Sequence, residues 1–130
     1  MTARRTTVDD LLASARARID RVGPPEALAA MRAGALLVDI RAEVQRDRDG
    51  AIPGALCHPR NVLEWRADPD SDAADPELSG DLTRRVIVVC DEGYQSSLAA
   101  ATLRDLGFSR ATDLDGGFQA WRAAGMAVAR

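Results

Sequence analysis

The chain has 130 residues and a formal net charge of −3, and 46% of its residues are hydrophobic while 28% are charged. This length suits one domain with a single sizeable core, and the composition is ordinary for a soluble globular protein. The slight acidity argues against nucleic acid as a partner, and no apolar run is long enough to span a membrane. With no signal peptide in the first residues, we expect a cytoplasmic protein whose two cysteines are free thiols.

The first elements expected along the chain are helical. Residues 7–10 read T-V-D-D, a helix start of the capping-box type, and apolar residues at helical spacing continue this helix to Asp20. A G-P-P sequence interrupts it, and a second helix follows over residues 26–32. We therefore divide the chain into a helical extension, residues 1–22, and a domain, residues 23–130.

The remaining elements alternate between strands and helices. Strands are expected over residues 35–40, 85–90 and 111–114 and after the turn I-P-G-A at 52–55, and helices over 96–106 and 118–124. Between them, residues 41–50 read as a loop or weak helix, 61–65 as a helical turn and 68–79 as an exposed loop. Short apolar strands that alternate with helices indicate an α/β fold with a mainly parallel sheet. In such a sheet, ligands bind beyond the carboxyl ends of the strands.

Cys90 stands at the carboxyl end of the strand V-I-V-V, before a short polar loop and an alanine-rich helix. The thiolate is the reactive form of cysteine, and a helix N-terminus favours it. The N–H groups of such a loop can also form a nest for an anion, and Gly93 permits the positive φ that the loop needs. Spacing alone favours a simpler interpretation, in which Cys90 is a small buried hydrophobe that ends a strand.

Four motifs change that interpretation, because together they resemble the rhodanese-like (sulfurtransferase) domain family. L-L-V-D-I-R at 36–41 resembles the family's first-strand motif ending in Asp-x-Arg, and G-A-I-P-G-A at 50–55 resembles its G-H-I-P-G-A. V-I-V-V-C-D-E-G-Y-Q-S-S at 86–97 resembles the active-site segment, a strand followed by C-x-x-G-x-R-S. L-D-G-G-F-Q-A-W-R-A-A-G-M-A-V at 114–128 is similar to the closing L-x-G-G-x-x-A-W-x-x-A-G-x-P-V. The resemblance runs from about residue 24 to 128, with the motifs in the family's order.

The resemblance implies a single rhodanese-like domain with a central, mainly parallel five-stranded sheet and helices on both faces. It makes Cys90 the nucleophile, which would take the outer sulfur of a donor as a persulfide and pass it to a thiophilic acceptor. The donor's anionic group would lie in a cradle made by the loop backbone, formed by Asp91, Glu92, Gly93, Tyr94, Gln95 and Ser96. No metal or organic cofactor is implied. The expected partners are a small-molecule sulfur donor, a thiol or cyanide-like acceptor and a protein persulfide, and we expect a monomer.

The active-site segment departs from the family pattern in two ways. Gln95 stands where the family most often has Arg, and its neutral amide cannot form the paired, charge-assisted bonds of a guanidinium. Asp91 and Glu92 add negative charge beside Cys90, and a carboxylate about 6 Å from a thiolate costs about 2–3 kcal/mol at an effective dielectric of about 20. Acids pointing into the cradle would suppress thiosulfate binding. Acids pointing outward would form a rim suited to an uncharged or cationic donor or a basic protein persulfide, and they are equally compatible with ordinary solvated loop acids.

Four charged residues outside the loop are candidates for a layer around the site, two of them at the end of the first strand: Asp39, Arg41, Arg60 and Arg66. Arg60 and Arg66 follow the I-P-G-A turn, and the family resemblance implies that this segment runs near the mouth of the site, where either would bring positive charge or else lie solvated on the surface. We expect Arg41 to form a structural ion pair and Asp39 to act as a structural hydrogen-bond partner.

Two further residues are given structural interpretations. Cys57 is expected to pack within a strand, and a resolving-thiol role is its weaker alternative. His58 is expected on the surface, since one histidine beside one cysteine makes no metal site.

Two other functions compete with sulfur transfer. A binding or regulatory module of the same fold, with little turnover, is favoured by Gln95 and by the two loop acids. A phosphatase or arsenate reductase of a related fold would need Arg at the sixth position after Cys90, where the sequence has Ser96.

Overall fold

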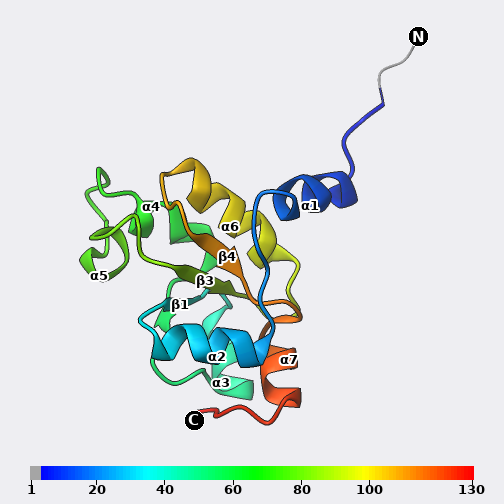
Figure 1. Cartoon of the computed structure of the whole chain (residues 1–130), viewed down its shortest axis with the longest axis vertical. Coiled ribbons are helices and arrows are strands. Elements are labelled where there is room, and N and C mark those ends of the chain that lie inside the picture. Colours follow the sequence, from blue (N-terminus) through cyan, green and yellow to red (C-terminus); the bar gives the residue numbers. More distant parts are fainter. Residues whose placement is uncertain (1–3) are drawn as a thin grey trace.

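A parallel sheet lies at the centre of the computed structural model, which describes residues 4–130 (Figure 1). Its strands run in the order β2-β1-β3-β4. They are β1 (Leu36–Asp39), β2 (Leu56–Cys57), β3 (Val86–Val89) and β4 (Ala111–Asp113), and each neighbouring pair is parallel. All four carboxyl ends therefore meet at one edge of the sheet, where a ligand site is expected.

The α/β architecture agrees with the sequence, but the described chain has four strands where five were expected. The place beside β4 is taken by a single parallel bridge between Val22 and Leu114. The Val22 N–H donates to the Asp113 carbonyl at 3.1 Å, and the Asp115 N–H donates to the Val22 carbonyl at 2.8 Å. A helix begins two residues later at Pro24, and a proline has no N–H to continue the ladder, so this strand stops after one residue.

Helices cover both faces of the sheet (Figure 1). One face carries α1 (Val8–Arg16), α4 (Leu63–Ala67), α5 (Pro76–Ser79) and α6 (Gln95–Asp105), with the 3₁₀ turn η1 (Arg60–Val62) leading into α4. The other carries α2 (Pro24–Arg32), α3 (Glu43–Asp49) and α7 (Gly117–Ala123). No helix in residues 4–130 has the length and apolar character needed to cross a membrane.

Each strand sends alternate side chains into two separate cores, as the period of two in a strand requires. Val38, Val86 and Val88 face the core under α6, whereas Leu37, Ile87 and Val89 face the core over α2 and α7. Both aromatic side chains of α7, Phe118 and Trp121, are buried in the second core. Because both faces are covered, β1 and β3 are apolar almost throughout rather than alternating.

The extension begins with the predicted capping box. The Thr7 hydroxyl accepts from the Asp10 N–H at 3.1 Å, and the Asp10 carboxylate accepts from the Thr7 N–H at 2.9 Å. The helix ends at Arg16 rather than at Asp20, so that prediction is four residues too long. The turn after Arg16 brings Ile19 into the core under α6 and leads the chain along β4.

The segment 68–79 is not entirely the exposed loop that was expected. It ends in α5, whose first turn is capped by the Asp75 carboxylate, and Leu78 of that helix is buried. His58 is not a free surface residue either, because its Nε2 lies 2.7 Å from Asp75 Oδ2. The hydrogen bond from His58 holds the pKa of the Asp75 carboxyl below its usual range. Apolar periodicity cannot reveal a single anchoring leucine or a pairing across 17 residues.

Candidate active site

Cys90 lies directly beyond β3, at the edge where the strand ends meet, and is 6% exposed. Its Sγ accepts two backbone N–H groups, from Gly93 at 3.1 Å and from Ser96 at 3.3 Å. Ser96 belongs to the first turn of α6, so the sulfur also faces the positive end of that helix dipole. The loop from Asp91 to Ser96, called the Cys90 loop below, therefore wraps around the sulfur with N–H donors facing it.

Gly93 allows the loop to make this turn. Its φ is +91°, and a Cβ there would lie 2.7 Å from the Gly116 nitrogen. Residues other than glycine rarely adopt this backbone conformation, and the close contact with Gly116 leaves no space for a side chain. The role that the sequence suggested for Gly93 is thus supported by two separate restraints.

The start of α7, which follows Gly116-Gly117, holds Cys90 and the beginning of its loop through two backbone hydrogen bonds. The Phe118 N–H donates to the Cys90 carbonyl at 2.9 Å, and the Gln119 N–H donates to the Asp91 carbonyl at 3.1 Å. A Cβ on Gly117 would lie 2.5 Å from the Cys90 carbonyl oxygen. This pair is therefore more than a turn, since it allows the start of α7 to approach the loop closely.

Asp113, which the sequence analysis did not single out, anchors the start of α6. Its buried carboxylate accepts the hydroxyls of Ser96 at 2.7 Å and Ser97 at 2.8 Å. It also accepts the guanidinium of Arg21, at 2.9 and 3.2 Å. A buried carboxylate is costly unless it is paired and hydrogen-bonded, and here both conditions are met. The end of β4 thus determines where the first turn of α6, and with it the Ser96 N–H, stands.

A cavity of about 670 Å³ opens above Cys90. Its wall includes Cys90 and most of its loop, the end of β1, the start of α3 and the segment 59–61. Tyr94 and Gln95 lie at its exposed side, so both line the cavity without closing it. Among residues 4–130, no three His, Cys, Asp or Glu side chains are grouped as a metal site would need.

The two loop acids lie at the wall and rim of this cavity. Glu92 is exposed, and the Asp91 carboxylate accepts the Gln119 amide at 2.9 Å, which turns it toward α7. The N–H groups of Gly93 and Ser96 remain on the sulfur. The Asp91 carboxylate therefore points away from the cradle, an arrangement that agrees both with an acidic rim and with ordinary solvated loop acids.

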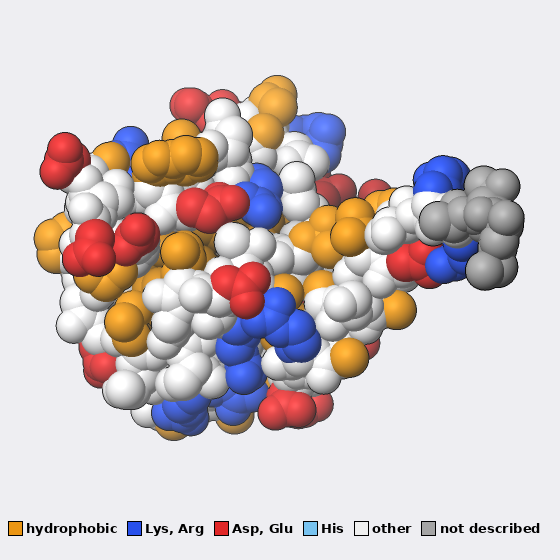
Figure 2. Space-filling model, turned by 90° about the horizontal axis from the view of Figure 1, so that it is seen from above, with side chains coloured by type: hydrophobic (Ala, Val, Ile, Leu, Met, Phe, Trp, Pro, Cys, Tyr) orange, Lys and Arg blue, Asp and Glu red, His pale blue; other side chains and the backbone are white. Residues whose placement is uncertain are grey.

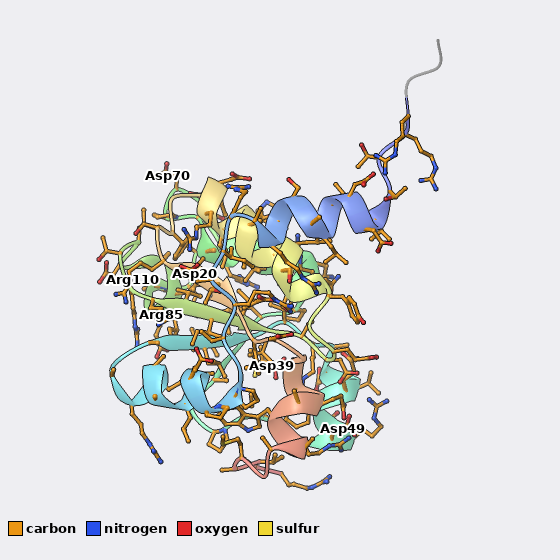
Figure 3. The ribbon with its side chains drawn as sticks, turned by 45° about the vertical axis from the view of Figure 1, so that its right-hand side comes forward. Asp20, Asp39, Asp49, Asp70, Arg85 and Arg110 are labelled. Atoms are coloured by element: carbon orange, nitrogen blue, oxygen red, sulfur yellow. The ribbon has the colours of Figure 1, made fainter. Side chains whose placement is uncertain are left out.

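Asp39 and Arg41 form a buried ion pair at the end of β1, which agrees with the structural roles expected of them. The Arg41 guanidinium meets the Asp39 carboxylate with its Nη2 at 2.7 Å from Oδ2 and its Nε at 3.1 Å from both oxygens. It also donates to the Gly50 carbonyl and lies 3.8 Å from the centre of the Phe118 ring. Figure 3 places Asp39 between the sheet and α7. The pair joins β1 to α7, and Arg41 also forms part of the cavity wall.

Of the two remaining arginine candidates, one lines the cavity and the other does not. Arg60 lines the cavity and is paired with Glu64 at 2.7 Å, so its charge at the mouth is partly neutralised. Arg66 does not line it, and donates instead to the Ala73 carbonyl. Cys57 belongs to the edge strand β2, but its side chain is exposed, so the expectation of packing is wrong. It does not line the Cys90 cavity.

The charged side chains around α1 and α6 show no single-sign patch. Figure 2 views the molecule from that side, and acidic and basic side chains are interspersed there.

The fold and the Cys90 geometry can be compared with known proteins. A model of the rhodanese-like domain matches residues 24–124. The chain belongs to the rhodanese-like domain family. The prediction made from four motifs is confirmed, and the match includes the Cys90 loop and ends in the turn after α7.

Several proteins that carry an enzyme name are similar to this chain in sequence. Thiosulfate sulfurtransferase GlpE of Stutzerimonas stutzeri is 42% identical over 100 residues, which are 76% of this chain and 82% of that protein. The protein of the same name in Pseudomonas entomophila is 39% identical over 103 residues, 79% of this chain and 84% of that one.

Two solved structures of similar length also superimpose on this chain. A Rhodopseudomonas palustris protein of unknown function, described as a possible tyrosine phosphatase, is 32% identical and matches with a TM-score of 0.88 over 98% of both chains. The human single-domain sulfurtransferase TSTD1 is 28% identical, with a TM-score of 0.66 over 79% of this chain and 95% of that one.

Proposed function

We propose that this rhodanese-like protein is a single-domain sulfurtransferase that carries sulfane sulfur as a persulfide on Cys90. The observation that carries the proposal is the pair of N–H groups on Sγ, from Gly93 at 3.1 Å and Ser96 at 3.3 Å. Donors in these positions stabilise negative charge on Sγ in the thiolate, which is the attacking form and the form that returns when the sulfur is passed on. The cavity beside Cys90 gives a donor access to it.

The chemistry needs no group beyond the thiolate and its cradle. The Cys90 thiolate attacks the outer sulfur of thiosulfate, a Sγ–S bond forms, and the S–S bond of the donor breaks so that sulfite leaves with the electron pair. A thiophilic acceptor, cyanide or a thiolate, then attacks the terminal sulfur of the persulfide. The Sγ–S bond breaks and the Cys90 thiolate returns. Charge balances in both steps, and the Cys90 loop supplies donors throughout.

The donor is either thiosulfate or a persulfide. The names of the curated relatives support thiosulfate. The rim of Asp91 and Glu92, with Gln95 in place of a cation, instead favours a less negative donor, such as a low-molecular-weight persulfide or a protein persulfide with a basic surface. A reducing cytoplasm, in which both thiols stay free, is the compartment we propose.

A binding module that has lost turnover is the second candidate, and the same rim and Gln95 are the observations that favour it. A phosphatase is less well supported, although one similar structure is described as a possible tyrosine phosphatase. Ser96 occupies the position where that reaction needs Arg, and its hydroxyl donates to Asp113 rather than facing the cavity.

The test is the mass of the intact protein after incubation with thiosulfate or, separately, with a low-molecular-weight persulfide. We expect the wild-type protein to gain one sulfur atom that cyanide removes. Cys90→Ser should gain none, and Cys57→Ser, the matched control at the exposed cysteine, should gain it normally. Absence of loading with either donor would favour the binding module. Loading of Cys90→Ser would remove Cys90 from the mechanism.

A further inference from the structure

The carbonyl of Gly93 is held by two arginines from the N-terminal extension. Arg16 Nη2 donates to it at 2.9 Å and Arg21 Nη2 at 2.7 Å. We propose that these two residues, called the arginine clamp below, are positioning residues for sulfur transfer that orient and polarise the Cys90 loop. This inference rests on the proposed function and adds to it a role for the segment before residue 24, where the family match begins.

The clamp is anchored independently of the loop. Helix α1 packs along α6 (Figure 1), and Ala15 and Ile19 are buried there. Arg16 also donates to the Ser97 hydroxyl at 3.0 Å. Arg21 is 19% exposed and is paired with Asp113 and Asp115. Each guanidinium is thus held by its own neighbours, and the Gly93 carbonyl meets two donors that are already in place.

Fixing this carbonyl fixes the N–H on the other side of the same peptide. The peptide between Gly93 and Tyr94 is trans and planar, so the Gly93 C=O and the Tyr94 N–H point in opposite directions. The carbonyl points at Arg16 and Arg21, so the Tyr94 N–H points away from them. Without the clamp, the Ser97 hydroxyl at 3.5 Å would be the remaining side-chain donor to this carbonyl, and the peptide after Gly93 would be less restrained, because glycine tolerates many backbone conformations.

The clamp also places two positive charges behind a loop that lacks its own. The position most often occupied by Arg in the family is Gln95, and the front of the loop carries Asp91 and Glu92. Bonds from a guanidinium to a carbonyl are charge-assisted and polarise the peptide, which strengthens its N–H as a donor. Burial opposes the charge of Arg21, yet its pKa is raised above the usual range by Asp113, Asp115 and the nearby Cys90. Because Arg21 is itself paired with Asp113 and Asp115, the clamp acts through its bonds to the Gly93 carbonyl rather than by offsetting the charge of the rim.

The experiment uses the full chain and substitutions in the extension. Arg16→Met removes one bond to Gly93 and leaves the pairing of Arg21 with Asp113 intact. Arg16→Met with Arg21→Met removes both bonds. Arg18→Met is the matched control, since Arg18 lies in the same segment but pairs with the exposed Asp105 and not with the loop. Arg16→Lys and Arg21→Lys restore a positive donor at each position.

Two readouts are taken, one of which does not depend on activity. The rate of sulfur loading should fall about tenfold in Arg16→Met and about 100-fold in the double variant, as expected for the loss of charged hydrogen bonds. Arg18→Met should load at the wild-type rate, and the lysine variants should recover part of the loss. The carbonyl ¹³C resonance of Gly93 should shift in the methionine variants and not in Arg18→Met. This resonance reports the clamp even if the wild-type protein carries no sulfur.

Several results would overturn the inference. A folded double variant that loads like wild type, or an unchanged Gly93 resonance, would exclude the clamp. So would a loss of loading that follows only the melting temperature and is equal in methionine and lysine variants. If the double variant fails to fold, Arg16→Met and Arg21→Lys decide the question, because both leave a cation beside Asp113.

Discussion

Gly93 is the residue in the Cys90 loop with the least freedom to change. Its φ of +91° and the 2.7 Å approach to the Gly116 nitrogen act together, because a side chain would meet both backbone strain and a backbone atom that cannot move aside. The N–H that Gly93 donates to the sulfur depends on the same conformation. Stability and chemistry are therefore coupled at this residue.

We predict that Gly93→Ala lowers the free energy of unfolding by about 2–4 kcal/mol, combining backbone strain with overpacking, and reduces sulfur loading by more than about tenfold. Urea unfolding and intact mass measure the two effects. Gly34→Ala is the control, because Gly34 has a φ of +108° but no atom within 4 Å of the place that an alanine methyl group would take. It should lose about 1–2 kcal/mol and load normally. Equal loading in both variants would contradict the role of Gly93.

At the scale of elements, the end of β4 connects three parts of the molecule. Asp113 binds the first turn of α6 through Ser96 and Ser97, and the extension through Arg21. Apolar packing by itself does not specify the rotation of a helix about its axis. The carboxylate supplies that specification, and the Ser96 N–H is directed at Cys90 as a result.

We predict that Asp113→Ala destabilises the protein by about 3–5 kcal/mol, because it leaves the Arg21 charge without its buried partner. Asp113→Asn, which keeps one acceptor oxygen, should cost less. Asp105→Ala is the comparison, since the pair of Asp105 with Arg18 is exposed and should contribute much less than a buried pair. Urea unfolding followed by tryptophan fluorescence gives all three values. A loss in Asp113→Ala no greater than in Asp105→Ala would show that β4 does not anchor α6 in this way.

At the scale of the whole molecule, the net charge of −3 and the cavity lining act in the same direction on an anionic donor. The charged side chains that line the cavity are Arg41, Glu43, Arg60, Asp91 and Glu92, three acids against two arginines. A doubly negative donor such as thiosulfate is therefore repelled during approach, even though the N–H groups stabilise it once bound. This repulsion extends over about 30 Å at 0.01 M salt and over only about 8 Å at 0.15 M, because salt screens it.

We predict that the second-order rate of loading from thiosulfate rises about twofold between 0.01 M and 0.15 M salt. Glu92→Gln should load faster than wild type at low salt and respond less to added salt. Glu77→Gln, an exposed acid on α5 away from the cavity, should behave like wild type. Stopped-flow measurement of sulfite release gives the rates. A rate that falls with salt would mean that the arginines near Cys90 govern donor approach.

Much of the fold could be predicted because its signals are local. The apolar runs of β1 and β3, the capping box at Thr7 and the glycine turns each follow from a few neighbouring residues. The predictions that were wrong concern long-range contacts, the end of a helix and the burial of a single side chain, Cys57. The missing fifth strand depends on where Pro24 begins α2, and the partner of His58 is 17 residues away.

By itself, the sequence determined the family, the alternation of strands and helices, and the place of Cys90 between a strand and a helix, because these properties follow from periodicity and from motifs of a few residues. Only the tertiary structure decided that the loop acids lie on a rim, that Asp113 holds the start of α6, and that Arg16 and Arg21 reach Gly93 across 77 and 72 residues. The physical reason is that backbone periodicity acts between near neighbours, whereas the approach of distant side chains depends on how whole elements pack.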